Sequence, residues 1–186
     1  MKRFRKEDIF TIPNIICYVR LLLIPVFCWL YITAETPADY MWATGVVLFS
    51  SFTDLFDGMI ARKFNQVTEL GKVLDPVADK LSHAAMALCL LTRYPLMWAL
   101  VALMAVKEGY MAVMGVKFLK KGKMLDGAMW FGKICTATLF TGLVVLFFFY
   151  NMSALAANII IGVMMTVMVI TLILYVPEFR KMKQEI

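Results

Sequence analysis

The chain has 186 residues, of which 62% are hydrophobic and only 17% are charged. A soluble domain is about half apolar, so the excess apolar surface must face something other than water. The composition therefore excludes an ordinary soluble domain and indicates a membrane protein. The net charge of +6 would also fit a nucleic-acid-binding protein, so its distribution along the chain has to decide between the two.

Six apolar segments are long enough to cross a membrane. A bilayer core of about 30 Å needs about 20 helical residues, and we place the segments near 14–33, 40–62, 72–92, 96–117, 127–150 and 154–176. The expected fold class is therefore all-α, a polytopic membrane protein with six transmembrane helices in one domain, residues 14–186.

The N-terminal segment differs from the rest. Residues 1–13 are basic with interspersed Phe and Ile side chains, which predicts a short amphipathic helix on the membrane surface. Asn14 follows Pro13, and we expect it to cap the first membrane helix. An approach of Asn14 to the functional site is the alternative.

The distribution of the positive charges along the chain indicates the membrane topology. Fourteen of the 19 Lys and Arg residues fall in the N-terminal segment, the second and fourth connections and the C-terminal end, whereas only Arg93 lies in the three opposite connections. Basic residues gather on the cytoplasmic side of membrane proteins. We therefore expect both termini in the cytoplasm, contact with anionic lipid, and no nucleic-acid partner.

The segment from residue 54 to residue 79 carries the clearest functional signal. Asp54, Asp57, Gly58, Ala61 and Arg62 have the spacing of one helix face, and Gly71, Asp75 and Asp79 follow at i, i+4 and i+8 on a second. Ionisable residues among apolar runs are costly and usually functional. Two such faces turned toward each other would gather four carboxylates at the cytoplasmic end of two helices.

The residue types predict chemistry at phosphorus. Carboxylates without His or Cys suit hard divalent cations such as Mg²⁺ or Mn²⁺, and a pair of such ions stabilises both the attacking and the leaving oxygen of a displacement. Gly58 and Gly71 allow close approach of a ligand. The guanidinium of Arg62 suits phosphate oxygens. We expect a site for a diphosphate-bearing substrate.

These residues resemble a known signature. The pattern Asp54-x2-Asp57-Gly58-x2-Ala61-Arg62-x8-Gly71-x3-Asp75-x3-Asp79 is similar, at every fixed position, to that of the CDP-alcohol phosphatidyltransferase family. The resemblance implies an enzyme that transfers a phosphatidyl group from CDP-diacylglycerol to an alcohol and releases CMP. It also implies a homodimer in a bacterial cytoplasmic membrane.

The resemblance assigns roles to the motif. Asp54, Asp57, Asp75 and Asp79 would bind two divalent ions, and Asp79 would also be the general base. The CDP-lipid would be bound by Asp54, Gly58, Ala61, Arg62 and Gly71.

The acceptor alcohol is less well determined. The segment 130–137, WFGKICTA, resembles the GK-x-x-T element of phosphatidylglycerophosphate synthases, which predicts glycerol-3-phosphate as acceptor. Arg20, Lys107 and Lys133 would bind this dianion. Gly115-Val116-Lys117 departs from the Gly-Leu-Arg usual in those enzymes, which leaves cardiolipin synthesis from phosphatidylglycerol open. That acceptor would need less positive charge and a second apolar entrance.

Simpler interpretations also stand. Arg20 could form a salt bridge with Glu108 or an aspartate, Lys107 and Glu108 could be a structural ion pair, and Lys133 could extend to the lipid headgroups. We expect His83 to be a packing or polar contact. A small cation-coupled transporter and a lipid-binding scaffold are the rival classes of protein.

Overall fold

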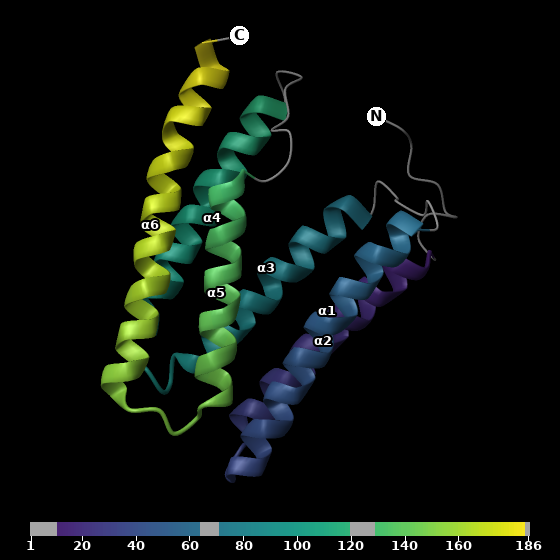
Figure 1. Cartoon of the computed structure of the whole chain (residues 1–186), viewed down its shortest axis with the longest axis vertical. Coiled ribbons are helices and arrows are strands. Elements are labelled where there is room, and N and C mark those ends of the chain that lie inside the picture. The colour runs from purple at the N-terminus through teal and green to yellow at the C-terminus, as the bar shows by residue number, and fades with distance from the viewer. Residues whose placement is uncertain (1–10, 64–70, 120–128, 185–186) are drawn as a thin grey trace. The chain divides into compact units, whose positions relative to one another are not determined.

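The computed structural model describes residues 11–63, 71–119 and 129–184, and six helices lie there (Figure 1). In chain order they are α1 (Ile12–Ile32), α2 (Pro37–Lys63), α3 (Gly71–Leu90), α4 (Met97–Leu119), α5 (Trp130–Phe148) and α6 (Ala154–Gln184). The all-α class is confirmed. Side chains at 12–13, 54–63, 72–73, 119 and 182–184 lie outside the described part of the chain.

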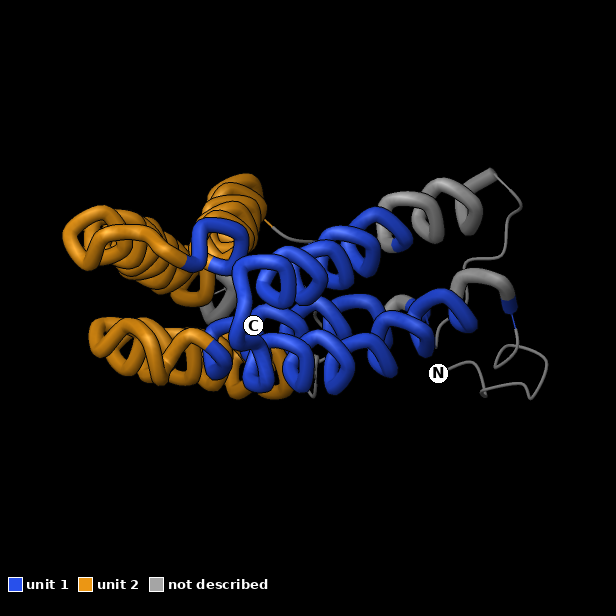
Figure 2. The backbone as a smooth tube through the Cα atoms, turned by 90° about the horizontal axis from the view of Figure 1, so that it is seen from below, with its two compact units in different colours: residues 1–89, 147–150 blue, residues 90–146, 151–186 orange. Residues whose placement is uncertain are grey.

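The chain divides into two compact units, which Figure 2 shows in different colours. The first contains residues 1–89 and 147–150, and therefore α1, α2 and nearly all of α3. The second contains residues 90–146 and 151–186, and therefore α4, most of α5 and α6. The prediction of a single membrane domain at 14–186 is not tested by this division.

In the first unit, α1 and α2 run side by side (Figure 1). A reciprocal capping box starts α2. The backbone N–H of Thr36 donates to Oδ2 of Asp39 at 2.8 Å, and the N–H of Asp39 donates back to the Thr36 hydroxyl at 3.4 Å. The N–H of Thr36 gains a side-chain acceptor in this way, and the N–H of Asp39, which also donates to the carbonyl of Thr36 at 3.1 Å, gains a second one.

Aromatic rings fix the same end of the first unit. Tyr31 lies 5.2 Å from Tyr40 and 4.2 Å from Phe147 between ring centroids. Tyr40 stacks on Tyr150 at 4.9 Å, and Phe27 meets Phe147 edge-on at 6.2 Å. Aromatic pairs of this geometry stabilise by about 1 kcal/mol beyond their area burial. They connect α1 and the start of α2 to residues 147–150.

In the second unit, α4 packs against α6. A buried aromatic cluster joins the three helices: Phe118 from α4, Phe131 from α5, and Tyr175 and Phe179 from α6. Phe179 is buried one turn after Tyr175, which explains why α6 continues through Pro177 to Gln184. The predicted segment ended at residue 176 and was too short.

Among the residues that the structure describes, four helices are long and apolar enough to cross a membrane: residues 14–32, 97–118, 130–148 and 154–181. Large apolar side chains such as Trp29, Leu22 and Leu155 are exposed on them. An apolar surface of this extent suits lipid contact, so the polytopic membrane class is confirmed. Membrane crossing by α2 and α3, whose predicted segments carry the motif charges, stays a prediction.

The start of α1 corrects one expectation. Thr11 is the N-cap residue and α1 begins at Ile12, so Asn14 lies inside the first turn and is not its cap. Its side chain is buried, with 1% exposed. The predicted interfacial helix at 1–13 cannot be compared with the structure over residues 1–10, which lie outside the described residues. Residues 12 and 13 already belong to α1.

Candidate active site

Helix α3 carries the second half of the aspartate motif. Gly71 is the first residue of the helix and is buried, and Asp75 and Asp79 follow one and two turns later on the same face. Both aspartates are partly exposed, and 42% of the Asp79 side chain is accessible. The two carboxylates are therefore held on a helix yet remain open to a ligand.

Helix α1 supplies partners to both carboxylates. Nη2 of Arg20 donates a charge-assisted hydrogen bond to Oδ1 of Asp79, and only 4% of the Arg20 side chain is exposed. The thiol of Cys17, three residues earlier, hydrogen-bonds the carboxylate of Asp75. An ion pair between Arg20 and an aspartate was one of the alternatives weighed from the sequence, and the structure contains it with Asp79.

The first half of the motif lies on α2. The helix spans Pro37–Lys63, so the helical spacing predicted for the motif residues is confirmed for the backbone. These residues are Asp54, Asp57, Gly58, Ala61 and Arg62. Their side chains lie outside the described part of the chain. The convergence of four carboxylates therefore stays a prediction.

The donor set fits a hard divalent cation. Asp75 and Asp79 offer carboxylate oxygens, and Mg²⁺ and Mn²⁺ prefer such ligands over nitrogen and sulfur. Within the described ranges, no three His, Cys, Asp or Glu side chains come together. The predicted site with four carboxylates would therefore depend on the α2 aspartates, whose side chains lie outside the described part of the chain.

A second polar group lies inside the second unit. Nζ of Lys107 donates to Oε1 of Glu108 at 2.7 Å, with 12% and 33% of the side chains exposed. Both residues belong to α4, so the pair lies within one helix and does not join two. The phenol of Tyr175 on α6 lies within electrostatic range of both charges and hydrogen-bonds the backbone of Met129.

Helix α5 brings the predicted GK-x-x-T element beside Tyr175. A Cβ atom at Gly132 would overlap the Tyr175 hydroxyl, so glycine permits this close approach of α5 and α6. The side chain of Lys133 is exposed, which fits an acceptor contact and headgroup contact equally. The Thr136 hydroxyl donates to the carbonyl of Gly132 at 3.1 Å, so it serves the helix backbone.

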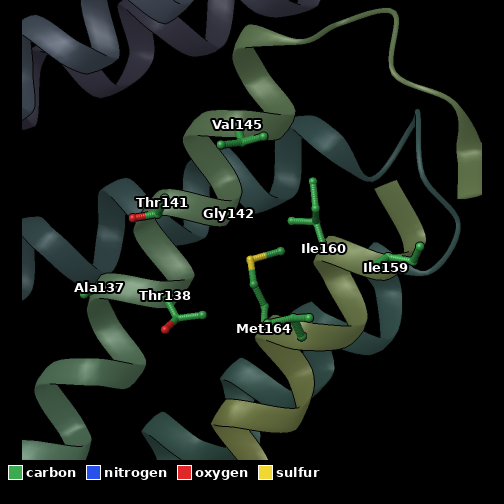
Figure 3. Close-up of a pocket in the computed structure, with 9 residues that line it drawn as sticks. Ala137, Thr138, Thr141, Gly142, Val145, Ile159, Ile160 and Met164 are labelled. Atoms are coloured by element: carbon green, nitrogen blue, oxygen red, sulfur yellow. The ribbon is translucent and has the colours of Figure 1, made fainter. Parts of the chain in front are cut away.

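The second unit also contains an apolar groove of about 480 Å³ between α5 and α6. Figure 3 shows the side chains of Thr138, Val145 and Met164 around it. Gly142 and Ile160 complete its central part. A space of this chemistry can hold hydrocarbon, and it lacks the charged groups that a diphosphate needs.

Two side chains of the polar groups were missed by the sequence analysis. Neither Cys17 nor Tyr175 was singled out from the sequence. Neither belongs to a motif, and each contacts a residue more than 40 positions away in the chain. His83 is buried one turn after Asp79, in agreement with a packing or polar role.

The profile of the CDP-alcohol phosphatidyltransferase family matches residues 10–176. The chain belongs to this family. The match includes α1 with Cys17 and Arg20, the whole aspartate motif, and α5. It therefore extends over both units.

Two groups of relatives differ in the acceptor that their names imply. The chain is 34% identical over 117 residues to a cardiolipin synthase (CMP-forming) of Streptomyces coelicolor, covering 61% of this chain and 54% of that protein. It is 41% identical over 88 residues to a CDP-diacylglycerol–glycerol-3-phosphate 3-phosphatidyltransferase of Pseudomonas fluorescens, covering 47% and 45%.

A third relative is a cardiolipin synthase (CMP-forming)/mitochondrial hydrolase fusion protein of Schizosaccharomyces pombe. It is 38% identical over 120 residues, which are 64% of this chain and 19% of that protein. The chain thus matches about half of each bacterial relative and about a fifth of the fusion protein. Two of the three names are of cardiolipin synthases (CMP-forming), and the third names glycerol-3-phosphate.

Proposed function

We propose that this CDP-alcohol phosphatidyltransferase transfers a phosphatidyl group from CDP-diacylglycerol to phosphatidylglycerol, forming cardiolipin and CMP. One observation carries the choice of acceptor: Arg20 and Lys107, two of the cations expected to bind glycerol-3-phosphate, each pair with a carboxylate. The proposal therefore departs from the glycerol-3-phosphate acceptor favoured by the sequence.

The aspartate motif would bind the donor at the cytoplasmic face of the membrane. Asp54, Asp57, Asp75 and Asp79 would hold two Mg²⁺ or Mn²⁺ ions, which neutralise charge on the diphosphate and on the departing CMP. Arg62 would donate to phosphate oxygens, and Gly58, Ala61 and Gly71 would leave space for the cytidine diphosphate. The oxygen-only chemistry and partial exposure of Asp75 and Asp79 support this assignment.

Asp79 would be the general base. Its carboxylate accepts the proton of the acceptor hydroxyl while that oxygen forms a bond to the β-phosphorus of CDP-diacylglycerol. The bond from the β-phosphorus to the bridging oxygen breaks, and CMP leaves with the electron pair. An aspartate is a weak base in water, so proton transfer must occur late, when the hydroxyl oxygen is already bonding to phosphorus.

The charge of the second unit favours a lipid acceptor. Glycerol-3-phosphate carries a dianionic phosphate, and placing it beside cations that are already neutralised leaves charge uncompensated. Phosphatidylglycerol carries one negative charge on a diester and brings two acyl chains. The apolar groove between α5 and α6 is suited to hydrocarbon of this kind.

Glycerol-3-phosphate is the second candidate acceptor. It is favoured by the exposed Lys133 in the GK-x-x-T element and by the name of the Pseudomonas relative. The two acceptors give different lipids from the same donor. A direct comparison of products therefore distinguishes them.

The experiment uses purified protein in mixed micelles with CDP-diacylglycerol and Mn²⁺, and supplies phosphatidylglycerol or glycerol-3-phosphate. CMP is measured, and the lipid product is identified by mass spectrometry. We expect CMP and cardiolipin with phosphatidylglycerol. Faster formation of phosphatidylglycerophosphate from glycerol-3-phosphate would overturn the proposed acceptor.

The same assay tests the enzyme class. Asp75→Ala should abolish CMP release with either acceptor, while Asp39→Asn, which changes a carboxylate at the opposite end of α2, should leave it intact. Release of no CMP by the wild-type protein with either acceptor would favour the transporter or scaffold alternatives.

A further inference from the structure

We infer that Arg20 is a positioning residue that fixes the carboxylate of Asp79 for the transfer reaction, and that it does not bind the acceptor. This inference rests on the proposed function, because it gives Asp79 the role of general base. It concerns a residue of α1, outside the aspartate motif.

The burial of the pair is asymmetric. Arg20 is 4% exposed in its side chain, whereas 42% of the Asp79 side chain is accessible. The guanidinium binds one oxygen, Oδ1, so this contact does not use Oδ2. An arginine stays protonated in proteins, so Arg20 keeps its positive charge at any pH at which the enzyme works.

A second contact from the same helix supports the inference. Cys17 and Arg20 are three residues apart and therefore share one face of α1. They contact Asp75 and Asp79, which are four residues apart on one face of α3. The two contacts run in the same order along both helices. Helix α1 thus fixes the orientation of two neighbouring carboxylates of the motif.

An acceptor-binding role fits Arg20 less well. A soluble or lipid acceptor must reach the cation that binds it, and the Arg20 side chain is almost fully enclosed. Removing a group that hydrogen-bonds and orients a metal-binding side chain typically lowers metal affinity or activity by 10- to 100-fold. Loss of a positioning residue should therefore lower kcat, whereas loss of an acceptor-binding residue should raise the acceptor KM.

The first test separates kcat from the acceptor KM. Arg20→Met should lower kcat by about 10- to 100-fold and change the acceptor KM by less than about threefold. Arg20→Lys retains the charge without the planar fork and should restore part of kcat. Arg180→Met removes an exposed charge on α6 and serves as the control. A KM raised tenfold or more with kcat unchanged would overturn the inference.

A matched pair of variants tests the contact of Cys17 with Asp75. Cys17→Ala removes this hydrogen bond, and we expect a smaller fall in kcat than for Arg20→Met because a thiol is a weak donor. Cys28→Ala removes a thiol from the same helix that contacts Cys89, and should leave kcat unchanged. Equal loss of kcat in both variants would argue against a specific effect on the motif.

The second test needs no activity. Asp79→Asn takes the carboxylate away from a buried guanidinium, which is strongly destabilising. Adding Arg20→Met removes that charge, so the double variant should melt at a higher temperature than Asp79→Asn alone in detergent. If the two substitutions lower the melting temperature additively, the pair does not form and the inference fails.

Different results would contradict the proposed function and the positioning role of Arg20. A wild-type protein that releases no CMP contradicts the proposed function whatever the variants do. A wild-type protein that is active, with an Arg20→Met variant affected only in acceptor KM, contradicts the positioning role and leaves the proposed function standing.

Discussion

Gly132 of α5 faces the hydroxyl of Tyr175 of α6 so closely that a single added methyl group would overlap it. The Tyr175 ring also packs against Phe131 at 4.7 Å and stacks on Phe179 at 5.9 Å, so it has little freedom to move. The first residue of the GK-x-x-T element therefore has a packing reason to be glycine, independent of any substrate.

Gly132→Ala should lower the free energy of unfolding by about 1–3 kcal/mol, because the added methyl group overpacks a rigid contact. Tyr175→Phe removes the overlapping oxygen and leaves the ring carbon Cζ at 3.4 Å, an ordinary contact distance. The double variant should therefore recover part of the loss in a detergent melting experiment, because Tyr175→Phe also removes the hydrogen bond with the Met129 backbone.

Gly162→Ala is the control, since nothing lies within 4 Å of the position of its Cβ. Alanine is the better helix former by about 1 kcal/mol, so this variant should be neutral or stabilised. Equal destabilisation by Gly132→Ala and Gly162→Ala would contradict the packing argument.

Removing one charge of the Lys107–Glu108 pair should destabilise the protein more than removing both. Lys107→Met leaves Glu108 without its 2.7 Å partner, and Glu108→Gln does the converse. A single charge inside an apolar helix costs about 3 kcal/mol, so each single variant should melt lower than the double variant. If Lys107→Met alone matches the double variant in melting temperature, the pair is not a structural unit.

Divalent ions should stabilise the folded protein before any substrate is added. A ligand that binds only the folded state at 100 times its Kd adds about 2.7 kcal/mol. Mn²⁺ should raise the melting temperature of the wild-type protein and of Asp39→Asn, and EDTA should reverse the effect. Asp75→Ala should show little response. If Mn²⁺ raised the melting temperature of Asp75→Ala as much as that of the wild-type protein, Asp75 would not be a metal ligand.

The capping box at the start of α2 gives a pH dependence. Hydrogen bonds from the Thr36 backbone and hydroxyl, and then from the backbone of Glu35, lower the pKa of Asp39. A depressed folded pKa stabilises the protein above the unfolded pKa of about 4, and the effect is lost as the pH falls through the folded pKa.

Asp39→Asn should therefore melt below the wild-type protein at pH 7, and the difference should shrink below about pH 4. Thr36→Ala removes the partner hydroxyl and should cost about 1 kcal/mol at pH 7. A difference between Asp39→Asn and wild type that is constant from pH 7 to pH 3.5 would contradict the hydrogen-bonded geometry.

The helices were predictable because each corresponds to one long apolar run, and the motif was predictable because its spacing is local. Contacts between distant segments were only partly predictable. Charge alone left Glu108 or an unspecified aspartate as the salt-bridge partner of Arg20, and the contact with Asp79 came from the structure. The contact of Cys17 with Asp75 depends on the register of two helices, which no local pattern records.

Two helix boundaries were wrong for local reasons. Asn14 suits a cap by residue type, but Thr11 takes that position and Asn14 is buried in the first turn. The predicted membrane segment ended at residue 176, whereas α6 continues to Gln184 with Phe179 buried in the aromatic cluster. Tertiary packing overrides local preference at both places.

The pairing of Arg20 with Asp79 also has a consequence for biosynthesis. The two residues are 59 positions apart, so α1 leaves the ribosome while its counter-ion is still untranslated. An arginine within a newly inserted helix costs about 2.5–3.5 kcal/mol at the bilayer centre. We therefore expect the nascent first helix to carry this free-energy cost until α3 is inserted and the ion pair between Arg20 and Asp79 can form.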